Sequence, residues 1–358
     1  MQKKDAVKPT LQTVADALGV SRSTVSNAYS RPDQLSPELR NRILDTARRV
    51  GYAGPNPTAR SLRRGRAGAI GVLFTASLPY AFTDPYAVQF LRGLAESVRG
   101  QETGLLLVPQ SLDDTGAAVS NAAVDGFCVF CMPDWHPSWA ALEARGLPLV
   151  SAQRRPTDGP DTLFVGIDEA DATRAAGRHL VGLGHRRVGV IADHLLAGPT
   201  GPVALSTPDD VGYYGSRERL RGYYDAFRDA GVDWAGISTV STDVNSKQAG
   251  TRAATFLLDQ DDPPTAVVAF SDTLALGVLD ALAARGLRPG RDVSVIGFDD
   301  IPEAEQASLT TIRQPAADRG RLSGQLLLDP PQGPAGRQIV LPTELVVRDS
   351  TRPAVTKE

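Results

Sequence analysis

A row of polar side chains near the N-terminus carries the clearest recognition chemistry in the chain. If a helix begins after Ser21, its apolar positions turn inward and its polar positions turn outward. Arginine pairs with guanine edges and asparagine with adenine edges in the major groove of DNA, whereas serine is less selective. The sequence therefore predicts a base-reading helix face made of Arg22, Ser23, Ser26 and Asn27, with Ser21 as the N-cap of the helix.

Two further helices are needed to hold this face. Thr10 is a natural N-cap for a first helix with an apolar stripe from Leu11 onward, and Gly19 permits the tight turn before the second helix. Ser36 starts a third helix, which Gly51 ends. The alternative is an ordinary three-helix bundle, but the turn glycine and the small polar outward face favour a helix-turn-helix that docks on DNA.

Charge is divided unevenly along the chain. Residues 1–66 hold 13 Lys and Arg against 5 Asp and Glu, whereas the remainder holds 25 against 36. The net charge of −3 therefore hides a positive N-terminal part, which suits phosphate contacts, and an acidic remainder, which the duplex would repel.

Residues 55–66 connect these two parts and allow two interpretations. Asn56 as N-cap and Pro57 at the first position suit one short helix, which is marginal on its own in water. Leu62 would then be an apolar wedge in the minor groove, with Arg60 near the phosphates. The alternative is a flexible basic tether with Leu62 packed on the rest of the protein, and the residues alone leave both open.

From residue 67 onward, short apolar runs alternate with helix-length stretches. This alternation is typical of parallel sheets, and about 290 residues are too many for one core, so we expect two domains. Ligands bind such sheets at the carboxyl ends of the strands. The expected strands are 69–74, 104–108, 126–130, 148–151, 187–191, 266–270 and 293–298, and the expected helices are 86–99, 172–183, 217–230, 247–258 and 273–285.

Other kinds of chemistry are poorly supported. Cys128 and Cys131 point to opposite faces of an expected strand, which argues against a shared metal or disulfide, and His185 suits a turn better than catalysis. We find no nucleophile elbow, phosphate loop, leader or membrane span. We expect a cytoplasmic protein that is not an enzyme and needs no metal or cofactor.

The chain resembles the LacI/GalR family of bacterial repressors, in order and spacing over nearly its whole length. The resemblance rests on residues 10–27, 35–40, 51–56 and 59–62, and then on 183–191, 270–277, 292–300 and 309–315. It implies a helix-turn-helix in residues 1–54, a hinge helix in 55–66, and an α/β body of two Rossmann-like lobes of the type I periplasmic-binding-protein kind. The implied lobes are 67–164 with 311–328, and 165–310 with 329–358.

The resemblance also implies roles for DNA-contacting residues. Arg22, Ser23 and Asn27 match the recognition positions, Leu62 matches a leucine that opens the central operator step, and Ala59 lies beside it. This match moves the interpretation of residues 55–66 toward the wedge. The full expected set is Thr10, Leu11, Ser21, Arg22, Ser23, Ser26, Asn27, Ala59, Arg60 and Leu62.

In the body, the resemblance implies an effector cleft. Arg219 matches an effector-binding arginine and Asp299 an aspartate that accepts hydroxyl hydrogen bonds; such groups suit a polyhydroxylated ligand. Gln153 stands where several family members carry aspartate, which puts a specific sugar in doubt. The remaining candidates are Tyr86, for which a stacking role is implied; Met132, which follows a strand end but for which packing is the more common role; and Ser271 and Asp272, which helix capping would equally explain.

Three functions from different classes follow. The favoured one is a regulator, a homodimer or tetramer, that binds a palindromic operator in double-stranded DNA and responds to a small sugar-like effector. The others are a carbohydrate-binding module without DNA binding, against which the basic N-terminal part argues, and an α/β enzyme, for which no catalytic group is found. Residues 194–215 form either a surface loop or a lip over the cleft.

Overall fold

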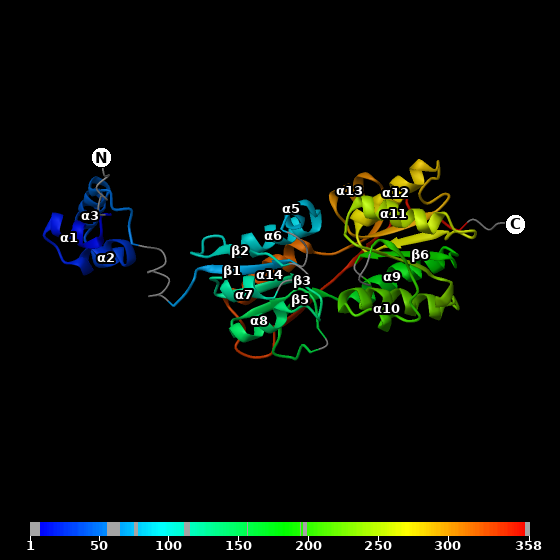
Figure 1. The fold of residues 1–358 in the computed structure, drawn as a ribbon, viewed down its shortest axis with the longest axis horizontal. Coiled ribbons are helices and arrows are strands. Elements are labelled where there is room, and N and C mark those ends of the chain that lie inside the picture. Colours follow the sequence, from blue (N-terminus) through cyan, green and yellow to red (C-terminus); the bar gives the residue numbers. More distant parts are fainter. Residues whose placement is uncertain are drawn as a thin grey trace. The chain divides into compact units, whose positions relative to one another are not determined.

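The computed structural model divides into two compact units, residues 1–68 and 69–358, here called the head and the body (Figure 1). It describes residues 8–55, 65–74, 78–110, 115–155, 157–193, 195 and 199–354. No helix in these ranges combines the length and the apolar character that a membrane span requires.

The head is the helix-turn-helix that its capping residues predict. Its helices are α1 (Leu11–Leu18), α2 (Arg22–Ser30) and α3 (Pro37–Val50), with a 3-10 turn, η1 (Pro32–Gln34), between the last two. Thr10, Ser21 and Ser36 each accept a hydrogen bond from a backbone N–H of the helix they precede. Gly19 and Gly51 end α1 and α3 in the left-handed conformation, which glycine adopts without strain.

A small apolar core fixes the three helices. Val14 of α1, Val25 of α2 and Ile43 of α3 are fully buried, and Ala15, Ala28 and Ala47 complete the contact. Val25 and Ala28 are the buried residues of α2, whereas Arg22, Ser23 and Ser30 are exposed and the remaining side chains are half-buried.

The first lobe of the body is a parallel six-stranded sheet in the order β12-β5-β4-β3-β1-β2. Its strands are β1 (Ala69–Phe74), β2 (Gly104–Val108), β3 (Gly126–Cys131), β4 (Leu149–Ser151), β5 (Leu163–Ile167) and β12 (Gln338–Leu341). The helices α6 (Pro85–Ser97) and α14 (Ala316–Leu328) pack together on one face, and α7 (Ala117–Asn121) and α8 (Ser138–Arg145) pack together on the other; the short α5 (Tyr80–Thr83) precedes α6.

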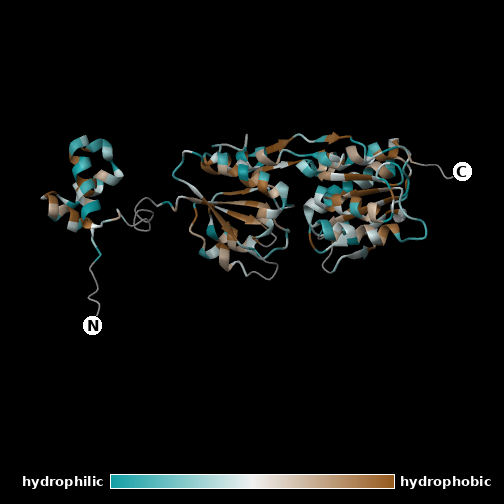
Figure 2. Ribbon diagram, turned by 90° about the horizontal axis from the view of Figure 1, so that it is seen from above, coloured by the Kyte–Doolittle hydropathy of each residue, from teal (hydrophilic) through white to brown (hydrophobic). Residues whose placement is uncertain are grey.

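The second lobe is a seven-stranded sheet in the order β13-β11-β10-β9-β6-β8-β7. Its strands are β6 (Val188–Asp193), β7 (Gly201–Val203), β8 (Ser238–Thr242), β9 (Ala266–Ala269), β10 (Ser294–Asp299), β11 (Thr310–Arg313) and β13 (Glu344–Val346). Of the strands in the described residues, only the edge strands β7 and β13 run antiparallel to their neighbours. The helices α9 (Glu169–Gly182) and α10 (Tyr214–Asp229) pack as one pair, and α11 (Lys247–Leu258) and α12 (Asp272–Ala284) as another; α13 (Pro302–Gln306), η2 (Pro208–Asp210) and η3 (Trp234–Gly236) are short. Apolar residues concentrate in the strands of both lobes (Figure 2).

The chain crosses between the lobes three times, and these crossings correct the expected boundaries. The first follows Ile167 and the second follows Arg313, so the expected breaks at 164/165 and 310/311 cut through β5 and β11. The third lies between β12 and β13, at residues 342–343, and not near Asp329. The physical reason is that residues 338–341 pair in parallel with β5 and thereby extend the first sheet.

Glycines allow the helix pairs of both lobes to approach closely. A Cβ on Gly320 of α14 would lie 2.0 Å from the backbone oxygen of Phe90 on α6, and a Cβ on Gly222 of α10 would lie 2.1 Å from the oxygen of Ala170 on α9. In each lobe, glycine therefore allows the backbones of two neighbouring helices to come into contact.

Gly320→Ala is expected to lower the free energy of unfolding by about 1–3 kcal/mol or more, because α6 and α14 must separate to admit the methyl group. Gly182→Ala is the matched control, because a Cβ there meets nothing within 4 Å. Urea denaturation of both variants measures the effect, and equal stability of the two would contradict the packing argument.

Candidate ligand cleft and nucleic-acid interface

The second helix of the head presents the polar row that the sequence predicts. Ser21, Arg22 and Ser23 are exposed, whereas Ser26 and Asn27 are half-buried. Arg22 makes no hydrogen bond or ion pair with another described residue, and the Asn27 amide lies at the 3.5 Å limit from Gln34 Oε1. Arg22 therefore has donors for base edges that no described residue occupies, and the Asn27 amide would give up only one long hydrogen bond to reach a base.

The first helix contributes less. Thr10 is exposed but forms a capping box with Thr13, and Leu11 packs partly against the core of the head. Their roles at a DNA surface stay predictions. Ala59, Arg60 and Leu62, on which the expected hinge helix depends, lie outside the described residues.

A small cavity of about 90 Å³ lies between the two lobes of the body. Both sheets direct the carboxyl ends of their strands toward it, as expected for sheets of this kind. The structure brings together five of the residues that the sequence proposes as effector-binding: Tyr86, Gln153, Arg219, Ser271 and Asp299.

Arg219 is the fixed cation of this cavity. Its Nε donates to Glu169 Oε2 over 2.8 Å, its Nη1 donates to the backbone oxygen of Phe270 over 2.7 Å, and its guanidinium lies 3.8 Å from the ring centroid of Phe298. Burial alone would lower the pKa of Arg219, but Glu169 and Asp299 outweigh it and raise the pKa above its usual value. The guanidinium is therefore charged and held in one orientation.

Asp299 ends β10 in a strained backbone conformation. Its φ is 125°, in the region that a side chain disfavours, and the next residue, Asp300, has a φ of 57°. Burial raises the pKa of Asp299 well above its usual range, and the nearby carboxylate of Asp272 raises it further. The strain aims a carboxyl group into the cavity that gains from a hydroxyl partner.

Two side chains missed by sequence reasoning, Gln314 and Arg319, connect Asp299 to the first lobe. Gln314 donates to Asp299 Oδ1 over 2.5 Å and accepts at Oε1 from the Tyr86 hydroxyl over 2.8 Å. Arg319 Nη1 also donates to Gln314 Oε1 over 2.8 Å and to the Tyr86 oxygen. Gln314 lies at the second crossing, so the network spans the hinge between the lobes.

Two other hydrogen-bonded bridges join the lobes across the cavity. Tyr213 donates its hydroxyl hydrogen to Gln153 Oε1, and its oxygen lies 2.6 Å from Cys131 Sγ. The Asn245 amide donates to the Tyr80 hydroxyl over 3.0 Å. The lobes are therefore held together by polar contacts that a ligand can replace.

The part of residues 194–215 that the structure describes is more ordered than a plain loop. It contributes the edge strand β7 and the turn η2, and it ends with Tyr213 in the cavity. Tyr213 and Gly215 line the cavity, whereas the other described residues of the segment do not. The choice between a surface loop and a lip stays a prediction, and residues 194 and 196–198 lie outside the described residues.

Ser271 and Asp272 have different positions. Ser271 caps α12 by accepting from the Leu274 N–H, and it also lines the cavity and donates to Asn245. Asp272 is fully buried behind the cavity, where its carboxylate accepts from the Thr311 hydroxyl and the Ile301 N–H. Its position corrects the expectation of an effector contact, because both oxygens serve the second lobe.

Met132 also lies away from the cavity. It is 2% exposed and packs with Val129, Trp139 and Leu142 under α7 and α8. Met132 follows the end of β3, but its side chain lies in the core of the first lobe and not toward the ligand. Packing therefore accounts for this residue.

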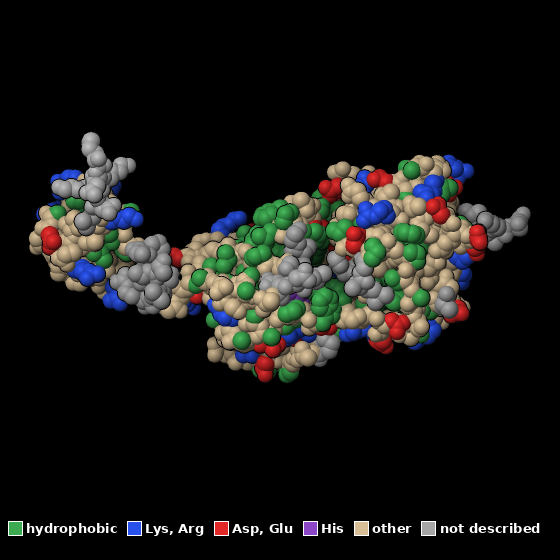
Figure 3. Space-filling view, in the orientation of Figure 1, with side chains coloured by type: hydrophobic (Ala, Val, Ile, Leu, Met, Phe, Trp, Pro, Cys, Tyr) green, Lys and Arg blue, Asp and Glu red, His purple; other side chains and the backbone are tan. Residues whose placement is uncertain are grey.

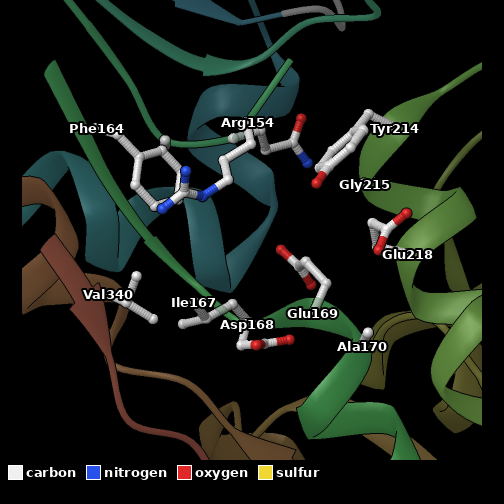
Figure 4. Close-up of a pocket in the computed structure, with 12 residues that line it drawn as sticks. Arg154, Phe164, Ile167, Asp168, Glu169, Ala170, Tyr214, Gly215, Glu218 and Val340 are labelled. Carbon is white, nitrogen blue, oxygen red and sulfur yellow. The ribbon is translucent and has the colours of Figure 1, made fainter. Parts of the chain in front are cut away.

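A second, larger space of about 300 Å³ opens beside the cavity and shares Gln153, Glu169 and Gly215 with it (Figure 4). The Arg154 guanidinium lies 4.5 Å from the ring centroid of Phe164, and Glu169 and Glu218 face the same opening (Figure 4). The two spaces are therefore adjacent, and polar side chains line both.

The acidic side of the cavity consists of Asp84, Glu169, Asp193 and Asp299. Burial, aided by Asp193, raises the pKa of Asp84 to about 6. Carboxyl and carboxylate oxygens are hydrogen-bond acceptors for hydroxyl groups, and tyrosine, asparagine and arginine supply the matching donors. Among the described residues, no cluster of His, Cys, Asp and Glu is arranged to hold a metal ion.

Asp84→Asn is expected to stabilise the protein most above pH 6. An acid whose pKa is raised by folding stabilises the fold while it is protonated, and this contribution is lost as pH rises from its unfolded value near 4 to about 6. The advantage of the asparagine should therefore grow over that range and level off at up to about 3 kcal/mol.

Thermal denaturation of the full chain between pH 4.5 and 8 tests this expectation. Asparagine can still accept the hydrogen bond that caps α6 at the Ala87 N–H. Asp261→Asn, on an exposed loop after α11, is the control. A stability difference that does not change with pH would contradict the assignment to Asp84.

Comparison with known proteins matches the head and the body together. A family profile described as bacterial regulatory proteins, lacI family, matches residues 10–56, and one described as periplasmic binding protein-like domain matches residues 178–351. The chain is 40% identical over 348 residues to the HTH-type transcriptional regulator Rv3575c of Mycobacterium tuberculosis, which covers 95% of this chain and 96% of that protein.

Solved structures give the same result. A LacI-family transcriptional regulator from Corynebacterium glutamicum superposes with a TM-score of 0.73 at 34% identity, covering 98% of this chain and all of that one. A complex of the transcriptional regulator CelR with cellobiose superposes with a TM-score of 0.65 at 27% identity, covering 96% and 99%.

Proposed function

Because the chain belongs to the LacI family of bacterial regulatory proteins, we propose that it is a sequence-specific transcriptional repressor controlled by a small sugar-like effector. It acts in the cytoplasm as a homodimer on a palindromic operator. One observation carries the proposal: a base-reading helix and a polar inter-lobe cavity occur in a single chain.

The DNA half of the proposal rests on α2. Its exposed Arg22 and half-buried Asn27 have the donors and acceptors that major-groove edges require, and α1 and α3 hold the helix by its apolar side. Two heads of a dimer would engage the two half-sites of a palindrome.

The effector half rests on the lining of the cavity. Aromatic, amide, guanidinium and carboxyl groups converge there, which suits a ligand with many hydroxyl groups. The CelR relative has been crystallised with cellobiose, and this supports a carbohydrate or a related polyol as the effector class here.

The dimer is supported by apolar residues on the surface of the first lobe. Phe82 of α5 is 65% exposed and Val88 of α6 is 43% exposed, and hydrophobic side chains gather in this region of the surface (Figure 3). Large apolar side chains in one exposed patch are typical of protein interfaces. We place the dimer contact on this face.

In the proposed mechanism, the effector changes the equilibrium between two arrangements of the lobes. It does so by binding more tightly to one of them, through the groups that now bridge the cavity. The altered angle between the lobes moves the two hinge segments of the dimer relative to each other and releases the operator.

The test has two measurements on the full chain. Selection from random duplexes, followed by fluorescence anisotropy, should yield a palindromic site bound at least 1,000-fold more tightly than random DNA. Pentoses, hexoses, cyclitols and disaccharides are then screened for release of this site. Binding without palindromic preference would refute the repressor, and release by no sugar or polyol would refute the proposed effector class.

Leu62→Ala is expected to weaken operator binding far more than binding to random DNA. A leucine inserted between base pairs contributes only where the central step is opened, whereas phosphate contacts contribute on any duplex. Anisotropy on both duplexes measures the ratio, with Leu39→Ala, a partly buried leucine of α3 outside the expected DNA-contacting set, as the control within the head. Equal losses on both duplexes for Leu62→Ala would contradict the wedge.

A further inference from the structure

The cavity contains a second arginine, Arg319 of α14, which no sequence pattern singles out. Arg319 is 3% exposed and lines the inner cavity. Nη2 donates to the backbone oxygen of Ala152, and Nη1 is shared between the Tyr86 hydroxyl and Gln314 Oε1. Arg319 therefore sits at the centre of the polar wall that the first lobe contributes.

Its charge is not compensated in the described part of the chain. No described carboxylate lies within 4 Å of the Arg319 guanidinium, whereas Arg219 is paired with Glu169 at 2.8 Å. Nε of Arg319 is buried and has no hydrogen-bond partner among the described residues. A buried arginine with a spare donor and no counter-ion is costly, and such a group in a binding cavity gains most from a ligand oxygen.

The bonds it already makes can be exchanged without loss. Tyr86 and Gln314 remain hydrogen-bonded to each other over 2.8 Å when the guanidinium turns from either of them. A ligand oxygen can therefore replace one partner of Nη1, or meet Nε after a small rotation, without leaving those two side chains unpaired.

We propose that Arg319 is a specificity-determining residue that donates a hydrogen bond to an oxygen of the effector, and that this effector is an uncharged polyol. The inference rests on the proposed function, since it concerns the ligand of the same cavity.

The uncharged character follows from the other groups. Four carboxyl groups line the cavity against two guanidiniums, and the carboxylate of Asp272 lies behind Asp299. Burial and neighbouring carboxylates raise the pKa values of Asp84 and Asp299, so this space already disfavours negative charge. A sugar phosphate or sugar acid would add to that repulsion, whereas hydroxyl groups satisfy both the acids and Arg319.

The experiment compares matched ligands on matched variants of the full chain. Thermal shift and calorimetry identify the neutral probe that binds from a panel of glucose, galactose, ribose, cyclitols and cellobiose, together with hexose phosphates and hexuronic acids. Affinities for that probe and for each of its singly deoxygenated forms are then measured on the native chain, on Arg319→Lys and on Arg319→Met.

Arg321→Lys is the control, because Arg321 lies on the same helix with its side chain 38% exposed and paired with Asp318. Arg319→Lys keeps the charge but loses the planar fork, so it guards against failure of the methionine variant to fold. Circular dichroism and operator binding without ligand establish that each variant is folded.

The expected result is at least a tenfold loss of affinity for the neutral probe in Arg319→Lys, from a lost charge-assisted hydrogen bond. One deoxygenated probe should bind the native chain and Arg319→Lys with the same affinity. This probe lacks the hydroxyl group that the Arg319 guanidinium contacts, so replacing the guanidinium costs it no further hydrogen bond. A merely structural role would weaken all probes by the same factor.

Each other outcome is decisive. If every probe loses the same factor, Arg319 only positions Tyr86 and Gln314, and the inference fails while the proposed function stands. If only a phosphate or an acid binds the native chain, the uncharged class is wrong. If no probe binds a chain that still recognises its operator, the sugar-like effector of the proposed function fails together with the inference.

Discussion

Arg219→Ala is expected to abolish the response to effector, with a loss of affinity of about 100-fold or more. The guanidinium is held by Glu169, by the Phe270 oxygen and by the face of Phe298, so its remaining donors are fixed toward the cavity. Loss of two charge-assisted hydrogen bonds to a ligand costs about 3 kcal/mol or more. Operator binding without effector should persist, because the head is a separate unit.

The same change has a cost in stability that must be separated from the loss of binding. Removing one partner of a buried ion pair leaves Glu169 uncompensated and destabilises a protein by about 3–5 kcal/mol. Arg219→Lys keeps the pair and should remain folded, yet it lacks the fork that holds several acceptors together. We therefore expect Arg219→Lys to bind effector poorly at nearly native stability.

Arg221→Ala is the control for this series, because Arg221 lies on the same helix and its side chain is 37% exposed. Calorimetry with the releasing ligand and anisotropy on the operator are the two measurements. A native ligand affinity for Arg219→Lys would show that the cleft binds through other groups, and loss of operator binding by a folded Arg219→Lys would show that Arg219 acts on the DNA state itself.

The head could be predicted from sequence almost to the residue. Thr10, Ser21 and Ser36 mark the starts of three helices and Gly19 and Gly51 the ends of two, and these signals act within a single turn. Each helix boundary is set by hydrogen bonds within one turn of the chain, and the packing of the three helices does not change it.

The lobe boundaries were harder because pairing partners are distant. Residues 163–167 and 338–341 are short and carry no periodic pattern. Residues 338–341 pair only with 163–167 in the described sheet, and 163–167 pair with β4 as well. A strand whose neighbour lies 174 positions away in register cannot be assigned from its own residues, as the pairing of Gln338 with Phe164 illustrates.

Only part of the cavity lining could be predicted, because several of its residues also depend on contacts between distant segments. Residues that end strands or match family motifs, such as Arg219 and Asp299, could be named in advance. Tyr213, Gln314 and Arg319 take their places through contacts between segments far apart, as in the hydrogen bond between Arg319 and Tyr86 across 233 positions. Met132 shows the reverse error, because a strand end alone does not say which side faces the ligand.

Asn27→Ala is expected to weaken operator binding by about 2–6 kcal/mol, or 30-fold and more, with little change on random DNA. A specific contact to a base edge contributes about 1–3 kcal/mol, and the proposed dimer makes it once in each half-site. The side chain is half-buried on α2 and its only described hydrogen bond, to Gln34, is at the 3.5 Å limit, so its removal costs the head little stability.

Asn41→Ala on the exposed side of α3 is the matched control, because it removes the same amide from the bracing helix. Anisotropy at several salt concentrations should leave the salt dependence of Asn27→Ala unchanged, since no phosphate contact is lost. A parallel loss on operator and random duplexes, or a reduced salt dependence, would mean that Asn27 contacts the backbone and that the bases are read elsewhere on α2.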